Sequence, residues 1–179
     1  MRIITFLILL ASVLYGCSES TDPNYTQDYN IISSLDLKAA VAQADDWHYS
    51  APKIVSYITQ KELIVTFPDG REVKKSLPDS AMFIAVAPYI TNTHDCSTHY
   101  LSTCQGELTE KTFQLKATDS TGNVLYDGSI ASLRNGFFEL WLPRDRTITL
   151  HIAYSGLSRD EIIGTYSNSN TCVTTAKLK

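Results

Sequence analysis

The alternation of apolar and polar residues predicts a chain built mostly of β-strands. After Pro52, β-branched and aromatic residues are concentrated in short segments, as is typical of strands. Turn-forming residues such as Gly, Asn, Asp and Pro separate these segments. The strands expected from the pattern are 54–57, 62–67, 72–75, 82–87, 112–118, 123–126, 137–142, 147–154 and 171–177.

Some of these segments support more specific predictions. The turn residues 68–71 lie between 62–67 and 72–75, which predicts a hairpin. Segment 82–87 is apolar without interruption and predicts a strand buried on both faces. The short, regularly spaced strands of the last third favour an antiparallel β-sandwich.

A short helix is expected before the strands. An acidic residue, Asp36, stands three places after Ser33, which is a helix-start pattern. Apolar residues then recur at roughly helical spacing to about Asp46. The predicted fold class is therefore mostly β (α+β): an antiparallel β-sandwich-like body with a short N-terminal helical segment. Residues 31–110 would contain the helix, the hairpin and the segment 93–108, which holds candidate metal ligands. Residues 111–179 would form the C-terminal sandwich.

The first thirty residues indicate export. Residues 1–17 form a signal peptide, with an apolar core of about a dozen residues, shorter than the ~20 that a membrane-spanning helix needs. Its end resembles the lipobox of bacterial lipoproteins, in which Cys17 receives the lipid. The alternative is a cleaved signal that releases a soluble protein. Either outcome places the mature chain outside the cytoplasm, and the polar residues 18–30 are expected to form a flexible tether.

Charge and composition remove one class of function. The net charge is −4, and Lys and Arg are scattered singly along the chain. A nucleic-acid backbone would be repelled by this balance, so nucleic-acid binding is not expected.

Chemistry-bearing side chains are concentrated in residues 93–108. This segment contains His94, Cys96, His99 and Cys104. Thiolates and imidazoles together are the donors that proteins use to hold copper or zinc. The segment is therefore the candidate metal-ligand region.

The cysteine count is also informative. If Cys17 carries lipid, three cysteines remain in an oxidising compartment, including Cys172 near the carboxyl end. Three thiols cannot all pair within one chain, so at least one is left over. An unpaired exported thiol is usually buried, or occupied by a metal or a redox partner.

Three interpretations of the cysteines remain open at this stage. Cys96 and Cys104 could form a structural disulfide while Cys172 is a buried thiol. Cysteine and histidine could instead hold a structural zinc ion. In the third interpretation all three thiolates bind Cu(I), Cys172 arrives from the last strand, and the thiolates also reduce Cu(II) as they form a disulfide.

Two further functions compete with metal binding. In a thiol-disulfide oxidoreductase of the cell envelope, Cys96 or Cys104 would attack a substrate disulfide. Against this, the chain has no close Cys-x-x-Cys pair and no strand-helix alternation of the thioredoxin type. A structural or adhesion module with a disulfide is the other alternative.

Several motifs in a fixed order give the chain a family resemblance. They are Ala87-Pro88-Tyr89, Thr93-His94-Asp95-Cys96, Thr103-Cys104, Gly106-Glu107, Asn135-Gly136-Phe137, Trp141-Leu142-Pro143-Arg144 and Thr171-Cys172-Val173-Thr174-Thr175. From about Leu35 onward the chain resembles the CueP family of bacterial copper-resistance proteins.

The resemblance implies a periplasmic protein that binds copper and protects against copper stress. It implies Cys96, Cys104 and Cys172 as the copper and redox residues, and His94 and His99 also fall on motif positions. It further implies delivery of copper to an exported copper enzyme such as a superoxide dismutase. We thus expect a cell-envelope protein, anchored by lipid to the membrane, that sequesters Cu(I). It would be primarily a metal-binding protein, with Cu(II) reduction as an additional activity.

Overall fold

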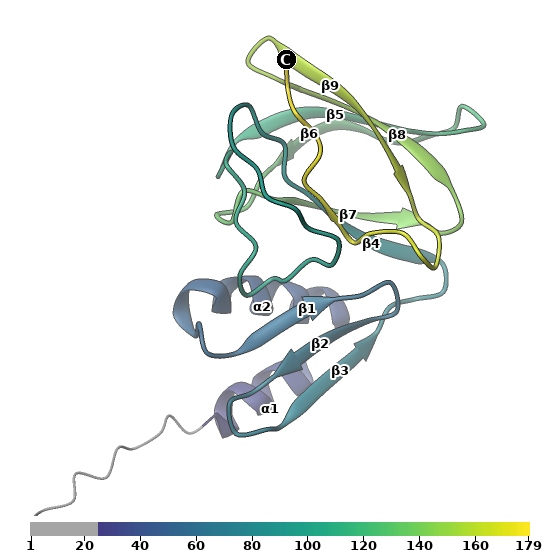
Figure 1. Cartoon of the computed structure of the whole chain (residues 1–179). Helices are drawn as coiled ribbons and strands as arrows, with labels where there is room; N and C mark the ends of the chain where they lie inside the picture. Colours follow the sequence, from purple (N-terminus) through teal and green to yellow (C-terminus); the bar gives the residue numbers. More distant parts are fainter. Residues whose placement is uncertain (1–24) are drawn as a thin grey trace, which may run out of the picture.

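A computed structural model describes residues 25–179. The predicted signal peptide, the lipidation candidate Cys17 and residues 18–24 of the expected tether lie outside the described residues. Two helices and a three-stranded sheet lie together, and the remaining strands form a second group beside them (Figure 1). The elements are α1 (Thr26–Ser34), α2 (Leu37–Ser50), β1 (Val55–Ile58), β2 (Glu62–Thr66), β3 (Glu72–Ser76), β4 (Ala81–Val86), β5 (Thr112–Asp119), β6 (Val124–Ala131), β7 (Phe138–Pro143), β8 (Thr147–Tyr154), β9 (Leu157–Gly164) and β10 (Cys172–Val173).

The helical segment is longer than the sequence pattern predicted. Asp36 caps α2, because its carboxylate accepts a hydrogen bond from the Ala39 backbone N–H at 2.9 Å. Residues 26–30 of the expected tether are instead helical and belong to α1. The tyrosine rings at positions 25 and 29 pack on Phe67, with ring centroids 6.3 and 5.7 Å apart, and these contacts order a segment of polar composition.

The first sheet has the order β1-β2-β3 and is antiparallel throughout. The predicted hairpin of β2 and β3 is confirmed, with Thr66 opposite Glu72. Gly70 stands in the turn with φ +85°, a conformation that glycine adopts without steric cost.

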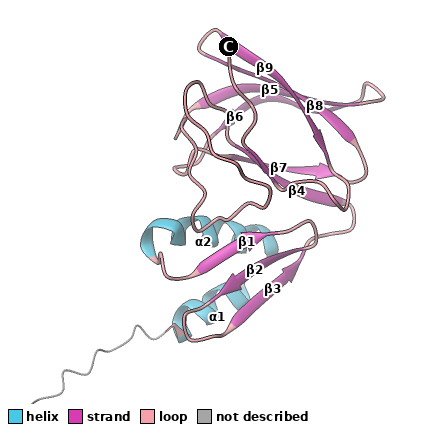
Figure 2. Cartoon of the chain, in the orientation of Figure 1, coloured by secondary structure: helices cyan, strands magenta, loops and turns pink. Residues whose placement is uncertain are grey.

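Two further sheets form the sandwich, with orders β10-β4-β7 and β6-β5-β8-β9 (Figure 2). Their facing side chains make one hydrophobic core, which includes Phe113, Phe138 and Ile148. The mostly β, α+β fold class is therefore confirmed. The sequence pattern did not predict β9, because charged and polar residues fill half of this edge strand.

The sheet β10-β4-β7 has a core on each face. Met82 and Ile84 of β4 face the sandwich core, whereas Phe83 and Ala85 face a second core shared with the helices and the first sheet. The predicted burial of this strand on both faces is confirmed. Because β4 pairs with β7 and β10, the sandwich includes a strand from the 31–110 segment as well as strands from 111–179.

The last strand differs from the expectation. The pattern predicted a strand over 171–177, but β10 contains two residues and runs parallel to β4. The short pairing nevertheless puts Cys172 beside Ala85 of β4, and β4 is the strand that is buried on both faces.

Among residues 25–179, no helix has the length and apolar character that crossing a membrane requires.

Candidate metal centre

The loop between β4 and β5 carries four of the predicted site residues, and Thr171 fixes its position. The His99 backbone N–H donates to Thr171 Oγ1 at 3.0 Å, and this hydroxyl donates to the Ile58 carbonyl at 2.7 Å. The Ile58 N–H in turn donates to the His99 carbonyl at 2.9 Å. This buried threonine, which directly precedes Cys172, therefore connects the loop to β1.

A glycine pair holds the far end of the same loop. The Gly106 N–H donates to the Asn135 carbonyl at 2.7 Å, so that two backbones touch. A Cβ atom on Gly136 would lie 2.6 Å from the Gly106 carbonyl oxygen, and Gly136 has φ +80°. Only glycine fits this contact without a shift of the backbone.

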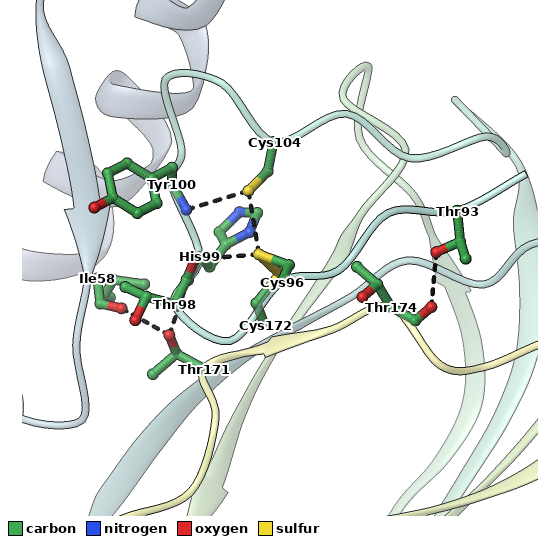
Figure 3. The surroundings of a disulfide bond; sticks show 10 residues. All are labelled: Ile58, Thr93, Cys96, Thr98, His99, Tyr100, Cys104, Thr171, Cys172 and Thr174. Carbon is green, nitrogen blue, oxygen red and sulfur yellow. Dashed lines mark hydrogen bonds between the residues drawn. A yellow bond between two sulfur atoms is a disulfide. The ribbon is translucent and has the colours of Figure 1, made fainter.

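Three sulfur atoms from distant parts of the chain meet beside this loop. Cys96 and Cys172 form a disulfide, with Cα atoms 5.6 Å apart. Cys104 is a free, buried thiol whose Sγ lies 3.5 Å from Cys96 Sγ. The sulfurs and the His99 ring point toward one another in Figure 3. The pairing proposed in the structural-disulfide interpretation, Cys96 with Cys104, is therefore not the one observed.

The three sulfurs differ in their access to solvent. Cys172 is 1% exposed and Cys104 is 7% exposed, whereas Cys96 is half-buried. Burial raises the pKa of the Cys104 thiol, and a hydrogen bond from the Tyr100 N–H opposes this effect. Cys96 lines two cavities, one of about 440 Å³ shared with Cys104 and one of about 330 Å³ shared with Cys172. An ion can therefore approach the sulfurs from either side of Cys96.

His99 lies at the floor of the site and is fully buried. Its ring packs between Phe83 and Phe137, with centroids 6.1 and 4.5 Å away, and neither ring nitrogen has a hydrogen-bond partner. Burial, together with the neighbouring histidines, lowers its pKa to about 3, so the imidazole is neutral near pH 7. Buried polar groups in proteins are normally paired. A neutral, unpaired imidazole whose ligand atom lies within 4.8 Å of those of Cys104 and Cys172 is therefore suited to bind a metal.

His94 occupies the solvent side of the site. It is exposed, and its ligand atom lies within 4.8 Å of those of Cys96 and Cys104. Of the two histidines that the sequence left unassigned, His48 places Nδ1 3.1 Å from the Leu101 carbonyl, and His151 pairs with Asp160 on the exposed face of the sandwich. The structure thus brings all five predicted ligand residues into one site.

Two carboxyl groups near His99 were not predicted from the sequence. Ligand atoms of Asp45, His99 and Glu139 lie within 4.8 Å of one another. Burial and the neighbouring Glu139 raise the pKa of Asp45 to about 10, and burial also raises the pKa of Glu139. One signal could have found Glu139, because it is a charged residue within the apolar strand 137–142.

Comparison with known proteins identifies the metal that this protein binds. The family described as "Periplasmic copper-binding protein CueP" matches residues 31–177, which is most of the chain. The chain belongs to the CueP family. A solved structure titled "Crystal Structure of S.CueP" is similar to it with a TM-score of 0.78 and 33% identity, over 85% of this chain and 94% of that one. A search of curated proteins gave no match.

Membership of the CueP family makes copper the metal and the periplasm the location. The site fits a CueP protein chemically, because thiolate sulfur and imidazole nitrogen are both good donors for copper. It also contains a redox element, since two of its three sulfurs are joined as a disulfide.

Proposed function

We propose that the protein sequesters Cu(I) through the thiolates of Cys96, Cys104 and Cys172, with His99 as an additional donor. The observation that carries this proposal is the meeting of three sulfurs separated by up to 76 residues in sequence. Cu(I) is a soft ion that prefers sulfur donors. Around one ion with metal–sulfur bonds of ~2.3 Å, three sulfurs in a trigonal plane would lie about 4 Å apart. The 3.5 Å between Cys96 and Cys104 is close to this separation.

The same sulfurs can reduce Cu(II). Two Cu(II) ions would each take one electron from the thiolates of Cys96 and Cys172, which gives two Cu(I) ions and the disulfide. The pairing of Cys96 with Cys172 supports this reaction, because these two sulfurs lie within bonding distance in the fold. An external dithiol would return the site to its reduced state by thiol-disulfide exchange, and would itself become oxidised.

Delivery would proceed by ligand exchange at the solvent side of the site. Cys96 is half-buried and His94 is exposed, and both line the cavity that leads to Cys104. A donor group of an acceptor protein could therefore replace these ligands first. The acceptor would be an exported copper enzyme, such as a superoxide dismutase. In this way the protein would protect the cell envelope from copper, held at the membrane by lipid on Cys17.

The oxidoreductase alternative is less well supported. An attacking cysteine needs an accessible thiolate with a lowered pKa. Cys104 is instead buried, and burial raises its pKa.

The test is a competition titration of the fully reduced protein with Cu(I) and a chelator. Single changes of Cys96, Cys104 and Cys172 to serine should each weaken binding by more than about 100-fold, beyond the ~10–100-fold that loss of an outer partner of a ligand costs. His151→Ala is the matched control, because it removes an exposed imidazole far from the sulfurs. Unchanged affinity in Cys104→Ser or Cys172→Ser would overturn the three-thiolate site.

A further inference from the structure

His99 lies between two different sets of donor atoms. In the register of the central sheet, Ala85 of β4 pairs with Cys172 on one side and with Glu139 on the other. Cys172 and Glu139 are therefore about 9.6 Å apart, which is two strand spacings. Ligand atoms of His99 lie within 4.8 Å of both side chains. The His99 ring therefore lies between the Cys172 sulfur and the Glu139 carboxyl group, whose strands flank Ala85.

Asp45 of α2 completes the carboxylate side. Its Oδ1 accepts a hydrogen bond from Asn135 Nδ2 at 3.1 Å. Asp45 Oδ2, Glu139 Oε1 and both His99 nitrogens are buried without a hydrogen-bond partner. Among residues 25–179, no lysine or arginine pairs with either carboxyl group. Unpaired buried polar groups are costly, and a bound cation would satisfy both carboxyl oxygens and one of the two ring nitrogens.

We propose that Asp45, His99 and Glu139 form a second copper site, which takes Cu(II). One imidazole and two carboxylates offer nitrogen and oxygen donors, which suit Cu(II), whereas the sulfurs suit Cu(I). The inference deepens the proposed function and rests on it, because it assigns the oxidised substrate to a place beside the thiolates. The two sites would use His99 in turn, because a neutral imidazole offers one unprotonated nitrogen as a ligand.

This second site has its own access from the surface. A cavity of about 230 Å³ is lined by Asp45, Asp46 and Asn135, and none of the three cysteines lines it. Arg134 also lines it, and its guanidinium is held 3.9 Å above the ring of Tyr49.

Binding would require a modest contraction. With metal–ligand bonds of about 2.1 Å, neighbouring donors lie roughly 3.0–3.4 Å apart and opposite donors about 4.2 Å apart. The donor atoms here lie within 4.8 Å of one another. Small side-chain rotations would therefore close the site.

The two sites differ in the redox state that they need. The sulfur site needs reduced cysteines, but no donor of the second site is sulfur. The structure contains the Cys96–Cys172 disulfide, and in this state the carboxylates and His99 are all in place. The second site is therefore complete when the sulfur site is not.

The experiment uses the disulfide form of Cys104→Ser, in which no thiol among residues 25–179 can reduce or bind the probe. Cu(II) is added against a weak competing chelator, and bound Cu(II) is followed by electron paramagnetic resonance and by absorbance. We expect one equivalent to bind with nitrogen and oxygen coordination and without a sulfur-to-copper charge-transfer band. Asp45→Asn and Glu139→Gln in this background should each weaken that binding at least about tenfold.

Matched controls separate this site from other acidic positions. Asp127→Asn changes the exposed partner of Lys116, and Asp160→Asn changes the exposed partner of His151. Both should bind Cu(II) as the background protein does. Each ligand variant should fold, because asparagine and glutamine keep the shape of the side chain, and a thermal unfolding curve of the copper-free variants checks this.

Equal Cu(II) binding by Asp45→Asn, Glu139→Gln and the controls would overturn the inference. The proposed function is tested separately, because Cu(I) binding by the reduced protein should be retained in Asp45→Asn. Loss of Cu(II) binding in the two ligand variants, with Cu(I) binding intact, would establish two distinct sites.

Discussion

The sandwich core and the ligand loop are held in place by different forces. In β5, exposed and buried residues alternate, so the strand is positioned by burial of every second side chain. The loop over residues 87–111 has no helix or strand, yet His99, Leu101 and Cys104 within it are buried. Specific hydrogen bonds and one glycine contact hold it instead. The comparison indicates that general hydrophobic patterning makes the framework, while a few individual residues make the site.

The largest expected effect is on the framework. Phe113 is fully buried, and its ring lies 5.7 Å from that of Phe138 and 5.3 Å from that of Tyr154. Phe113→Ala should lower the free energy of unfolding by about 3–5 kcal/mol. Urea unfolding measures this change, and Cu(I) titration of the folded variant should give the wild-type affinity. A parallel loss of affinity would show that the two regions are not independent.

A smaller effect is expected at the glycine contact of the loop. Gly136→Ala should lower the free energy of unfolding by about 2–3 kcal/mol, because it combines a positive φ with a Cβ atom 2.6 Å from the Gly106 carbonyl oxygen. Gly122→Ala is the matched control, with φ +89° and no atom within 4 Å of its Cβ, so it should cost only about 1 kcal/mol. Gly136→Ala should also weaken Cu(I) binding, whereas Gly122→Ala should not. Equal effects of the two variants would rule out an anchoring role for the contact.

The smallest effect concerns a polar anchor in the sandwich. Hydrogen bonds from Thr121 and Asn123 hold the pKa of Asp119 well below its usual range. A lowered folded-state pKa contributes stability above the unfolded pKa near 4, and that stability is lost as the pH falls toward the folded pKa. Asp119→Asn should therefore be less stable than wild type at pH 7, and the difference should shrink below about pH 4. Unfolding curves at several pH values measure it; a constant difference would contradict this origin.

Hydrophobic pattern predicted the framework well, and its failures have physical causes. The apolar run of β4 predicted burial on both faces, and alternate residues do face two cores. β9 was missed because Ser158, Arg159 and Asp160 break the apolar pattern. Helix α1 was missed because aromatic contacts with Phe67, which directly follows β2, order it, and local composition does not report such contacts.

The site was predictable only where its residues are close in sequence or match family motifs. His94, Cys96, His99 and Cys104 lie within one segment, and the motif around Cys172 supplied the third sulfur. The pairing of Cys96 with Cys172 did not follow from spacing, because it depends on the parallel bridge between β10 and β4. Asp45 and Glu139 lie on a helix and a strand that are far apart in sequence, so only the fold brings them to His99.

X-ray absorption spectroscopy of the reduced protein loaded with one equivalent of Cu(I) tests the central claim most directly. The account predicts an edge characteristic of Cu(I) and three sulfur scatterers at ~2.3 Å, with loss of one scatterer in Cys172→Ser. A copper shell made only of nitrogen and oxygen, or a spectrum unchanged in Cys172→Ser, would contradict it.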